Sequence, residues 1–103
     1  MKDDIKVVTI CGSMRYSKEM MKVAKDLEIE KGYSVIQCVY FSAEDKCDNI
    51  DEEKLGKIHR KKIDISDAIY VVNIDGYIGN STKSEIEYAL NHGKEVIYHE
   101  EII

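Results

Sequence analysis

The chain alternates between two patterns of apolar positions. Short runs of β-branched and other apolar residues, typical of buried strands, alternate with longer segments whose apolar positions recur at helical spacing. The runs predict strands over 5–10, 35–40, 68–73 and 94–98, and the longer segments predict helices over 16–31, 51–66 and 81–92. The predicted order of elements is therefore βαβαβαβ.

Local signals predict the ends and the buried faces of the helices. Ser17 is expected to cap the first helix and Gly32 to end it, while Gly93 ends the third. The second helix carries acidic residues in its first turn and basic residues later, as the helix dipole favours. The stripes expected to face the sheet are Leu55, Ile58 and Ile65 on the second helix and Ile86, Ala89 and Leu90 on the third.

Strands that alternate with helices predict an α/β fold with parallel pairing and right-handed crossovers. We expect a small doubly wound parallel sheet of four strands in the order 2-1-3-4, flavodoxin-like or Rossmann-like, with helices on both faces. A chain of 103 residues has room for one such core, so residues 1–103 are expected to form a single domain. Ligands of such sheets bind beyond the carboxyl ends of the strands where the winding reverses, here between the first and third strands.

The loop after the first strand carries groups that suit a phosphate or a ribose. In Gly12-Ser13-Met14-Arg15, the glycine permits close backbone approach, and the hydroxyl and guanidinium stand at a helix start, where anions are favoured. No GxGxxG motif follows the strand, so no dinucleotide cofactor is expected. A plain strand-to-helix turn is the alternative.

The start of the third predicted helix repeats this arrangement. Gly79 and Asn80 lead into Ser81 and Thr82, so two helix N-termini can converge on one anion. A local alternative exists, because 82–85 matches a capping box in which Glu85 only binds a backbone N–H.

This helix also carries two glutamates. Glu85 and Glu87 lie about 200° apart around the helix axis, so only one of them can face the crevice. The other is expected to be solvated.

Net charge argues against a nucleic-acid partner. The chain has a formal charge of -5 with 34% charged and 44% apolar residues, and its single basic cluster, residues 59–62, is flanked by acidic residues. Binding a polyanion needs a concentrated basic face. We therefore expect this cluster to be a solvated helix face.

Cysteines and histidines show no metal-ligand spacing and no CxxC pair, so neither a disulfide framework nor a metal site is expected, and the histidines are expected at the surface or at helix ends. These residues are Cys11, Cys38, Cys47, His59, His92 and His99. The N-terminus lacks the apolar core of a secretory signal, and no apolar run reaches the roughly 18 residues of a membrane span. A cytoplasmic protein without membrane association is expected.

Three segments in the same order resemble the nucleoside 2-deoxyribosyltransferase superfamily. They are ICGSMR at 10–15, ISDAIYVV at 65–72 and STKSEIEYA at 81–89. The first segment is most similar to the 2'-deoxynucleoside 5'-phosphate N-hydrolase branch, which has a very similar Cys-Gly-Ser-Ile-Arg. In the third, Glu87 replaces a glycine that is usual in the superfamily.

The resemblance implies roles for particular residues. Glu85 would be the nucleophile, and the 5' end of a nucleotide would lie near Ser13, Arg15 and Ser81. Relatives commonly carry an aspartate on the helix before the third strand, where this sequence has His59 and Arg60. His59 and Asp64 are therefore the candidate acid or base groups.

The implied activity is cleavage or transfer at the N-glycosidic bond of 2'-deoxynucleosides or their 5'-monophosphates. Glu85 would attack C1', the base would leave, and water or a second base would resolve the ester, as in a retaining glycosidase. No cofactor is implied, and relatives assemble as homodimers or larger. A nucleotide-binding or sensing module with weak catalysis is the main alternative, and a flavodoxin-like flavin carrier is a third.

Overall fold

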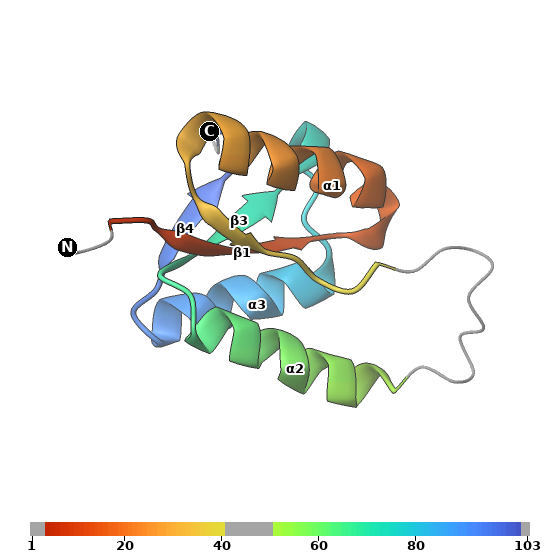
Figure 1. The fold of residues 1–103 in the computed structure, drawn as a ribbon. Coiled ribbons are helices and arrows are strands. Elements are labelled where there is room, and N and C mark those ends of the chain that lie inside the picture. The colour runs from red at the N-terminus through yellow and green to blue at the C-terminus, as the bar shows by residue number, and fades with distance from the viewer. Residues whose placement is uncertain (1–3, 41–50, 102–103) are drawn as a thin grey trace.

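The computed structural model describes residues 4–40 and 51–101, which contain a four-stranded parallel sheet with helices on both faces (Figure 1). The strands are β1 (Val7–Gly12), β2 (Ser34–Ile36), β3 (Ala68–Val72) and β4 (Glu95–Tyr98). They lie in the order β2-β1-β3-β4, and each neighbouring pair is parallel. The predicted fold class and strand order are confirmed.

Two strands differ in extent from their apolar runs. β1 continues to Gly12, because it stays paired with β3 up to Val72. β2 pairs with β1 over three residues only, although the pattern predicts a strand over 35–40. β2 lies at the edge of the sheet, and beyond it the Gln37 carbonyl accepts a hydrogen bond from Lys62 Nζ at 2.8 Å instead of continuing the ladder.

The first helical segment begins earlier than predicted. A 3₁₀ turn, η1 (Met14–Tyr16), leads into α1 (Ser17–Asp26), which continues as a π-helical turn, η2 (Leu27–Lys31). The predicted cap at Ser17 is wrong: Ser13 caps η1 by accepting from the Arg15 N–H, and Ser17 is already inside the helix. Gly32 ends the segment as predicted, with a positive φ of 70° that glycine adopts without strain.

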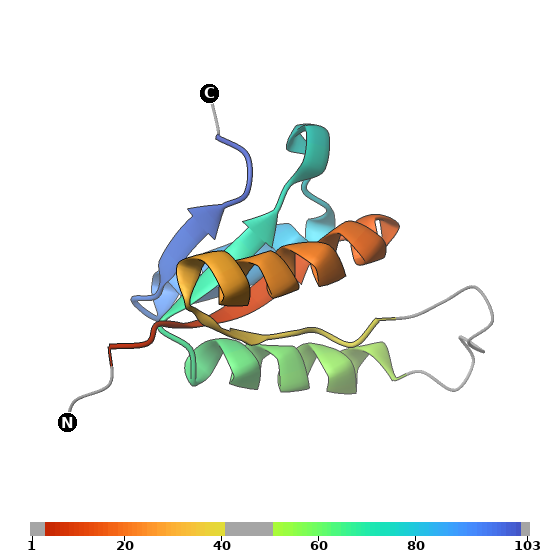
Figure 2. The same cartoon turned by 45° about the horizontal axis from the view of Figure 1, so that its top comes forward.

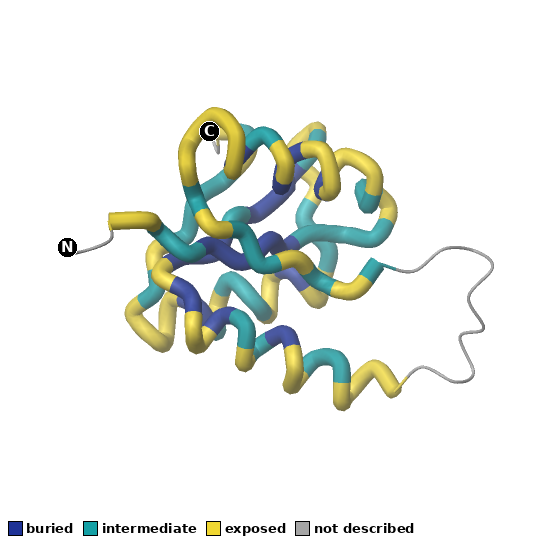
Figure 3. Tube along the Cα trace, in the orientation of Figure 1, coloured by how far each residue is buried: buried dark blue, intermediate teal, exposed yellow. Residues whose placement is uncertain are grey.

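Helices cover both faces of the sheet (Figures 1 and 2). α1 lies on one face, and α2 (Glu52–Asp64) and α3 (Asn80–Asn91) lie on the other. Burial is concentrated in the central strands and on the helix faces that meet them, as Figure 3 shows.

Alternate residues of β1 contribute to two separate cores. Ile10 packs into the cluster that includes Met20 and Ala24 of α1. The next residue, Cys11, belongs to the cluster that includes Ile63 of α2 and Ala89 of α3. Because side chains of a strand alternate between faces, Cys11 points toward the face where α2 and α3 pack.

The buried stripe of α2 is not the predicted apolar one. His59 and Ile63 are buried, whereas Ile58 and Ile65 are 41% and 61% exposed. β1 presents polar groups to this helix: the Thr9 hydroxyl bonds to Ser66 Oγ at 2.6 Å and to the Lys62 carbonyl at 3.1 Å. A polar partner on the sheet therefore allows polar residues to be buried where an apolar stripe was expected.

The buried face of α3 also differs from the predicted apolar stripe. Ala89 is fully buried and Ile86 packs against the same core, as predicted, but Leu90 is 61% exposed. Thr82 is 3% exposed, so polar residues again take part of the inner face. Gly93 follows the helix with a φ of 70°, as its predicted role as terminator requires.

Within the described residues, no helix has the length and apolar character needed to cross a membrane. Cys47 and the polar stretch 42–49 lie outside the described residues.

Candidate functional site

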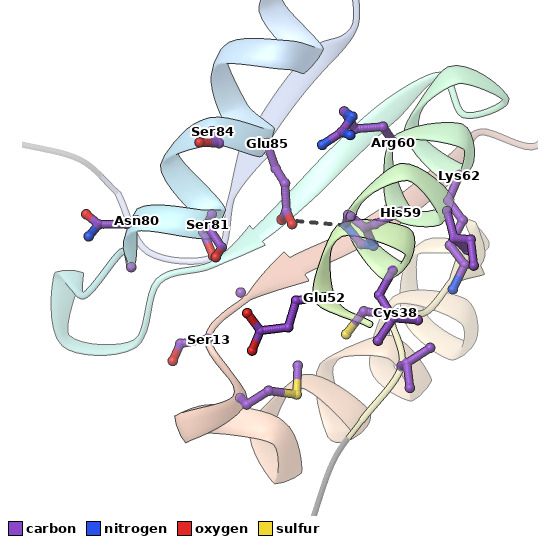
Figure 4. A pocket seen from close by; sticks show the side chains of 18 of the residues that line it. Ser13, Cys38, Glu52, His59, Arg60, Lys62, Asn80, Ser81, Ser84 and Glu85 are labelled. Carbon is purple, nitrogen blue, oxygen red and sulfur yellow. Dashed lines mark ion pairs between the residues drawn. The ribbon is translucent and has the colours of Figure 1, made fainter. Parts of the chain in front are cut away.

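A cavity of about 630 Å³ opens at the carboxyl ends of β1 and β3, where the sheet topology predicts a ligand (Figure 4). The loop after β1, the start of α2 and the start of α3 surround it. The expected site residues that line it are Gly12, Ser13, Met14, His59, Gly79, Ser81, Thr82 and Glu85. Asn80 lines it as well.

Gly12 permits the close packing at the base of this cavity. A Cβ at this position would lie 3.1 Å from Met20 Sδ and 3.3 Å from the Val72 carbonyl oxygen. A side chain would therefore need the tip of Met20 and the Val72 carbonyl to give way by a few tenths of an ångström. The sequence predicts that Gly12 lets the backbone come close to a ligand. In the structure, Gly12 lets β1 come close to β3 and α1.

The start of α3 decides between the two interpretations of Glu85. The helix begins at Asn80 with Gly79 as its N-cap, and no side chain forms a cap hydrogen bond. The capping-box alternative is therefore wrong, because Thr82 is inside the helix and not at its cap. Instead, the first N–H groups of α3, which have no acceptor within the helix, lie at the cavity beside Ser81.

The Glu85 carboxylate meets two buried groups on neighbouring elements. Its Oε1 lies 3.5 Å from His59 Nε2 of α2, and the same ring nitrogen lies 3.3 Å from Cys11 Sγ of β1 (Figure 4 shows the first contact as a dashed line). The side chains of Glu85 and His59 are 23% and 10% exposed, and Cys11 is 1% exposed. The three groups form a cluster at the inner wall of the cavity.

Burial shifts the pKa of each of these groups toward its neutral form. The pKa of Glu85 rises to about 7 through burial, against the opposing effects of a hydrogen bond from Cys11 and the charge of Arg60. Burial, with a smaller contribution from Lys62, lowers the pKa of His59 to about 4. Burial and the neighbouring Glu85 raise the pKa of Cys11 well above its ordinary value.

Two expected site residues do not line the cavity. Arg15 is exposed, and its guanidinium stacks 4.1 Å above the ring of Tyr77, which itself lines the cavity. Asp64 is exposed on α2, where its Oδ1 accepts a 2.6 Å hydrogen bond from the Tyr88 hydroxyl. The structure therefore places His59 at the site and Asp64 away from it.

Among the two glutamates of α3, Glu85 faces the crevice and Glu87 is exposed. His92 and His99 are exposed, as expected, but His59 is not a surface residue. The expectation of a solvated face at 59–62 is wrong for most of the cluster: His59, Arg60 and Lys62 line the cavity.

Sequence reasoning missed several residues that line the cavity. Glu52, in the first turn of α2, reaches into it and is the second acidic residue, after Glu85, among its described lining residues (Figure 4). Cys38 and Tyr77 also line it. Strand alternation could have placed Cys11 on the face opposite Ile10, but nothing in the sequence showed that His59 would meet it there.

No protein-family model and no curated protein sequence matches the chain. Among solved structures, the chain is similar to that of a Clostridium botulinum CMP N-glycosidase, BcmB. The two are 24% identical, with a TM-score of 0.53 over 90% of this chain and 70% of the other. This likeness shows that the two proteins share the α/β fold.

Proposed function

We propose that this protein cleaves the N-glycosidic bond of nucleosides or nucleoside 5'-monophosphates, with Glu85 as the nucleophile. The observation that carries the proposal is the position of Glu85: its carboxylate lies in the cavity wall, one turn into a helix whose N-terminus faces the same cavity. The resemblance of 10–15 and 81–89 to nucleoside 2-deoxyribosyltransferases supports this role. The shared fold with an enzyme named as a CMP N-glycosidase agrees with it.

The chemistry is a double displacement at the anomeric carbon. An ionised Glu85 oxygen attacks C1', the C1'–N bond breaks, and its electrons leave with the base. Water or a second base then attacks C1' and releases the carboxylate. Because the pKa of Glu85 is raised to about 7, the nucleophilic form becomes the major one only above that pH.

The departing base needs a proton. Two residues of the cavity, His59 and Glu52, bear on how that proton is supplied. His59 contacts Glu85 directly, but its lowered pKa keeps the imidazole neutral near pH 7, so it can orient Glu85 without supplying a positive charge. Glu52 reaches into the same cavity from the first turn of α2, which favours it as the proton donor or relay.

The 5' end of the substrate fits beside the start of α3 and the loop after β1. Ser13 and Ser81 offer hydroxyl groups there, and the N-terminus of α3 offers free N–H groups and a favourable dipole. Arg15 can join them if its guanidinium leaves the Tyr77 ring, since surface cation–π contacts are worth only about 0.5–1 kcal/mol. A phosphate at C5' would use all of these groups.

The test is to measure release of free base by chromatography. The purified protein is incubated with each deoxynucleoside and deoxynucleoside 5'-monophosphate and, because BcmB is named for CMP, with the ribonucleotides. Glu85→Gln should lower base release by more than about 1,000-fold, since it removes the nucleophile. Glu87→Gln, a matched change on the exposed side of the same helix, should leave it near the wild-type rate.

Equal activity of the two variants, or equal loss in both, would contradict the role of Glu85. Adding a second free base separates transfer from hydrolysis, because a transferase forms a new nucleoside with it. Binding of nucleotides without any release of base would favour the sensing module instead. One observation favours that alternative: Asp64, at the end of α2, is exposed and does not line the cavity.

A further inference from the structure

The cluster of Cys11, His59 and Glu85 joins a thiol, an imidazole and a carboxyl group from three different elements. Their ligand atoms, one from each residue, all lie within 4.8 Å of one another. They come from β1, α2 and α3, so their spacing in the sequence does not predict that they meet. Hydrogen bonding explains their contacts in part, but the set is also one of the ligand combinations that zinc uses in proteins.

Two of the three distances between the ligand atoms match those around a shared metal ion. Zinc bonds of about 2.3 Å to sulfur and about 2.0–2.2 Å to nitrogen and oxygen, at tetrahedral angles, place the ligand atoms roughly 3.3–3.6 Å apart. Cys11 Sγ and His59 Nε2 are 3.3 Å apart, and His59 Nε2 and Glu85 Oε1 are 3.5 Å apart. Cys11 Sγ and the Glu85 carboxylate lie within 4.8 Å of each other, so an ion between the three atoms requires at most about 1 Å of closing between that pair.

Charge and access favour the same ion. A thiolate and a carboxylate together carry two negative charges, so a divalent cation would leave the buried cluster neutral. The thiolate and imidazole favour zinc over magnesium or calcium, which prefer oxygen ligands. His59 and Glu85 line the cavity, so an ion can enter from there and keep its fourth coordination position open to water.

We propose that Cys11, His59 and Glu85 bind one zinc ion, with the fourth position open to the cavity. Binding forms one Zn–S, one Zn–N and one Zn–O bond, and it releases to solvent the thiol proton and, where the Glu85 carboxyl is protonated, that proton as well. The bound ion engages the Glu85 oxygen that would attack the sugar, so zinc inhibits the glycosidase proposed above. Only this inhibition rests on the proposed function; metal binding does not.

Cobalt titration of the metal-free protein tests the site without any enzyme assay. One equivalent of Co²⁺ should give a thiolate-to-cobalt charge-transfer band and the visible bands of a four-coordinate ion, and Zn²⁺ should remove both. Cys11→Ser should abolish the charge-transfer band and weaken zinc binding by more than about 100-fold, the upper range for loss of an outer-shell partner. His59→Gln should weaken it similarly.

The matched control is the double variant Cys38→Ser/Cys47→Ser, which retains Cys11 as the only thiol of the chain. It should bind cobalt as the wild type does, and circular dichroism checks that each variant is folded. A charge-transfer band that persists in folded Cys11→Ser, or that disappears in the double variant, overturns the proposal. Absence of a one-to-one cobalt complex in the wild type overturns it as well.

The proposed glycosidase function and the proposed metal site can be tested independently of each other. If no substrate releases base, the cobalt spectra still decide whether the metal site exists. If base is released, zinc should inhibit the wild type and a chelator should restore activity. Inhibition that is retained in Cys38→Ser/Cys47→Ser and lost in Cys11→Ser assigns the effect to the Cys11 site, and inhibition retained in Cys11→Ser contradicts that assignment.

Discussion

The pKa values of Glu85 and His59 are reversed from their ordinary order, because the carboxyl group has the higher value and the imidazole the lower. The pKa of the carboxyl group is raised to about 7 and that of the imidazole is lowered to about 4, so both are neutral between these values. The physical cause is burial at the inner wall of the cavity, where the charged form of either group loses hydration. A nucleophile in such a wall is desolvated before substrate arrives.

The two shifts predict opposite effects of pH on stability. The raised pKa of Glu85 increases the free energy of unfolding. This stabilisation is complete below pH 4.5, the ordinary pKa of the group, and is lost as pH rises toward 7. The lowered pKa of His59 also increases the free energy of unfolding. This stabilisation is complete above pH 6.5 and is lost as pH falls through 4. In the wild type these effects oppose each other, so stability should change little between pH 4.5 and 6.5.

Single variants should reveal each effect in urea unfolding of the metal-free protein. His59→Gln should lose stability as pH rises from 4.5 to 7, and Glu85→Gln should lose it as pH falls from 6.5 to 4, each by up to about 3 kcal/mol. Glu87→Gln is the control and should follow the wild-type profile. Parallel profiles for His59→Gln and Glu85→Gln would contradict the opposed shifts.

At the scale of elements, the junction of β1, β3 and α1 is packed too tightly for a side chain at Gly12. The three nearest atoms to a Cβ there are 3.1–3.3 Å away and belong to Met20 and Val72. In contrast, a Cβ at Gly56 in α2 would meet only Arg60 Nη1, at an ordinary 3.5 Å. The two glycines therefore have opposite roles in stability.

Replacing each glycine by alanine should change stability in opposite directions. Gly12→Ala should lower the free energy of unfolding by about 1–3 kcal/mol through overpacking. Gly56→Ala should raise it by about 0.5–1 kcal/mol, because alanine is the better helix former. Thermal or urea unfolding measures both, and a Gly12→Ala protein as stable as the wild type would contradict overpacking at this junction.

At the scale of the whole molecule, the cavity exists because two crossover connections bring distant loops to one edge of the sheet. Arg15 follows β1 and Tyr77 follows β3, yet the guanidinium and the ring are in contact at 4.1 Å. Tyr16 adds an edge contact to the same ring, with centroids 6.2 Å apart. These contacts connect the two loops at the mouth of the proposed 5' site.

Arg15→Ala should therefore affect substrates with and without a phosphate differently. The KM for a nucleoside 5'-monophosphate should rise about tenfold or more, because a charge-assisted contact is lost, while the KM for the free nucleoside should change little. Lys18→Ala, which removes another exposed cation one turn later, is the matched control. Equal increases for both substrates would contradict a phosphate role for Arg15.

The sequence by itself determined the α/β fold, the strand order and the edge of the sheet where the cavity lies. Those features follow from local apolar periodicity and from the handedness of crossovers, which every parallel α/β sheet shares. Helical geometry also showed that only one of Glu85 and Glu87 can face the crevice, and the resemblance to nucleoside 2-deoxyribosyltransferases favoured Glu85.

Only the tertiary structure decided which groups surround Glu85. The meeting of Cys11, His59 and Glu85 depends on how α2 and α3 pack against β1, an interface that also contains polar contacts such as Thr9 with Ser66. Apolar periodicity carries no information about buried polar partners from distant elements. The pKa values and ligand geometry of the cluster arise from burial and distance, which are properties of the folded chain alone.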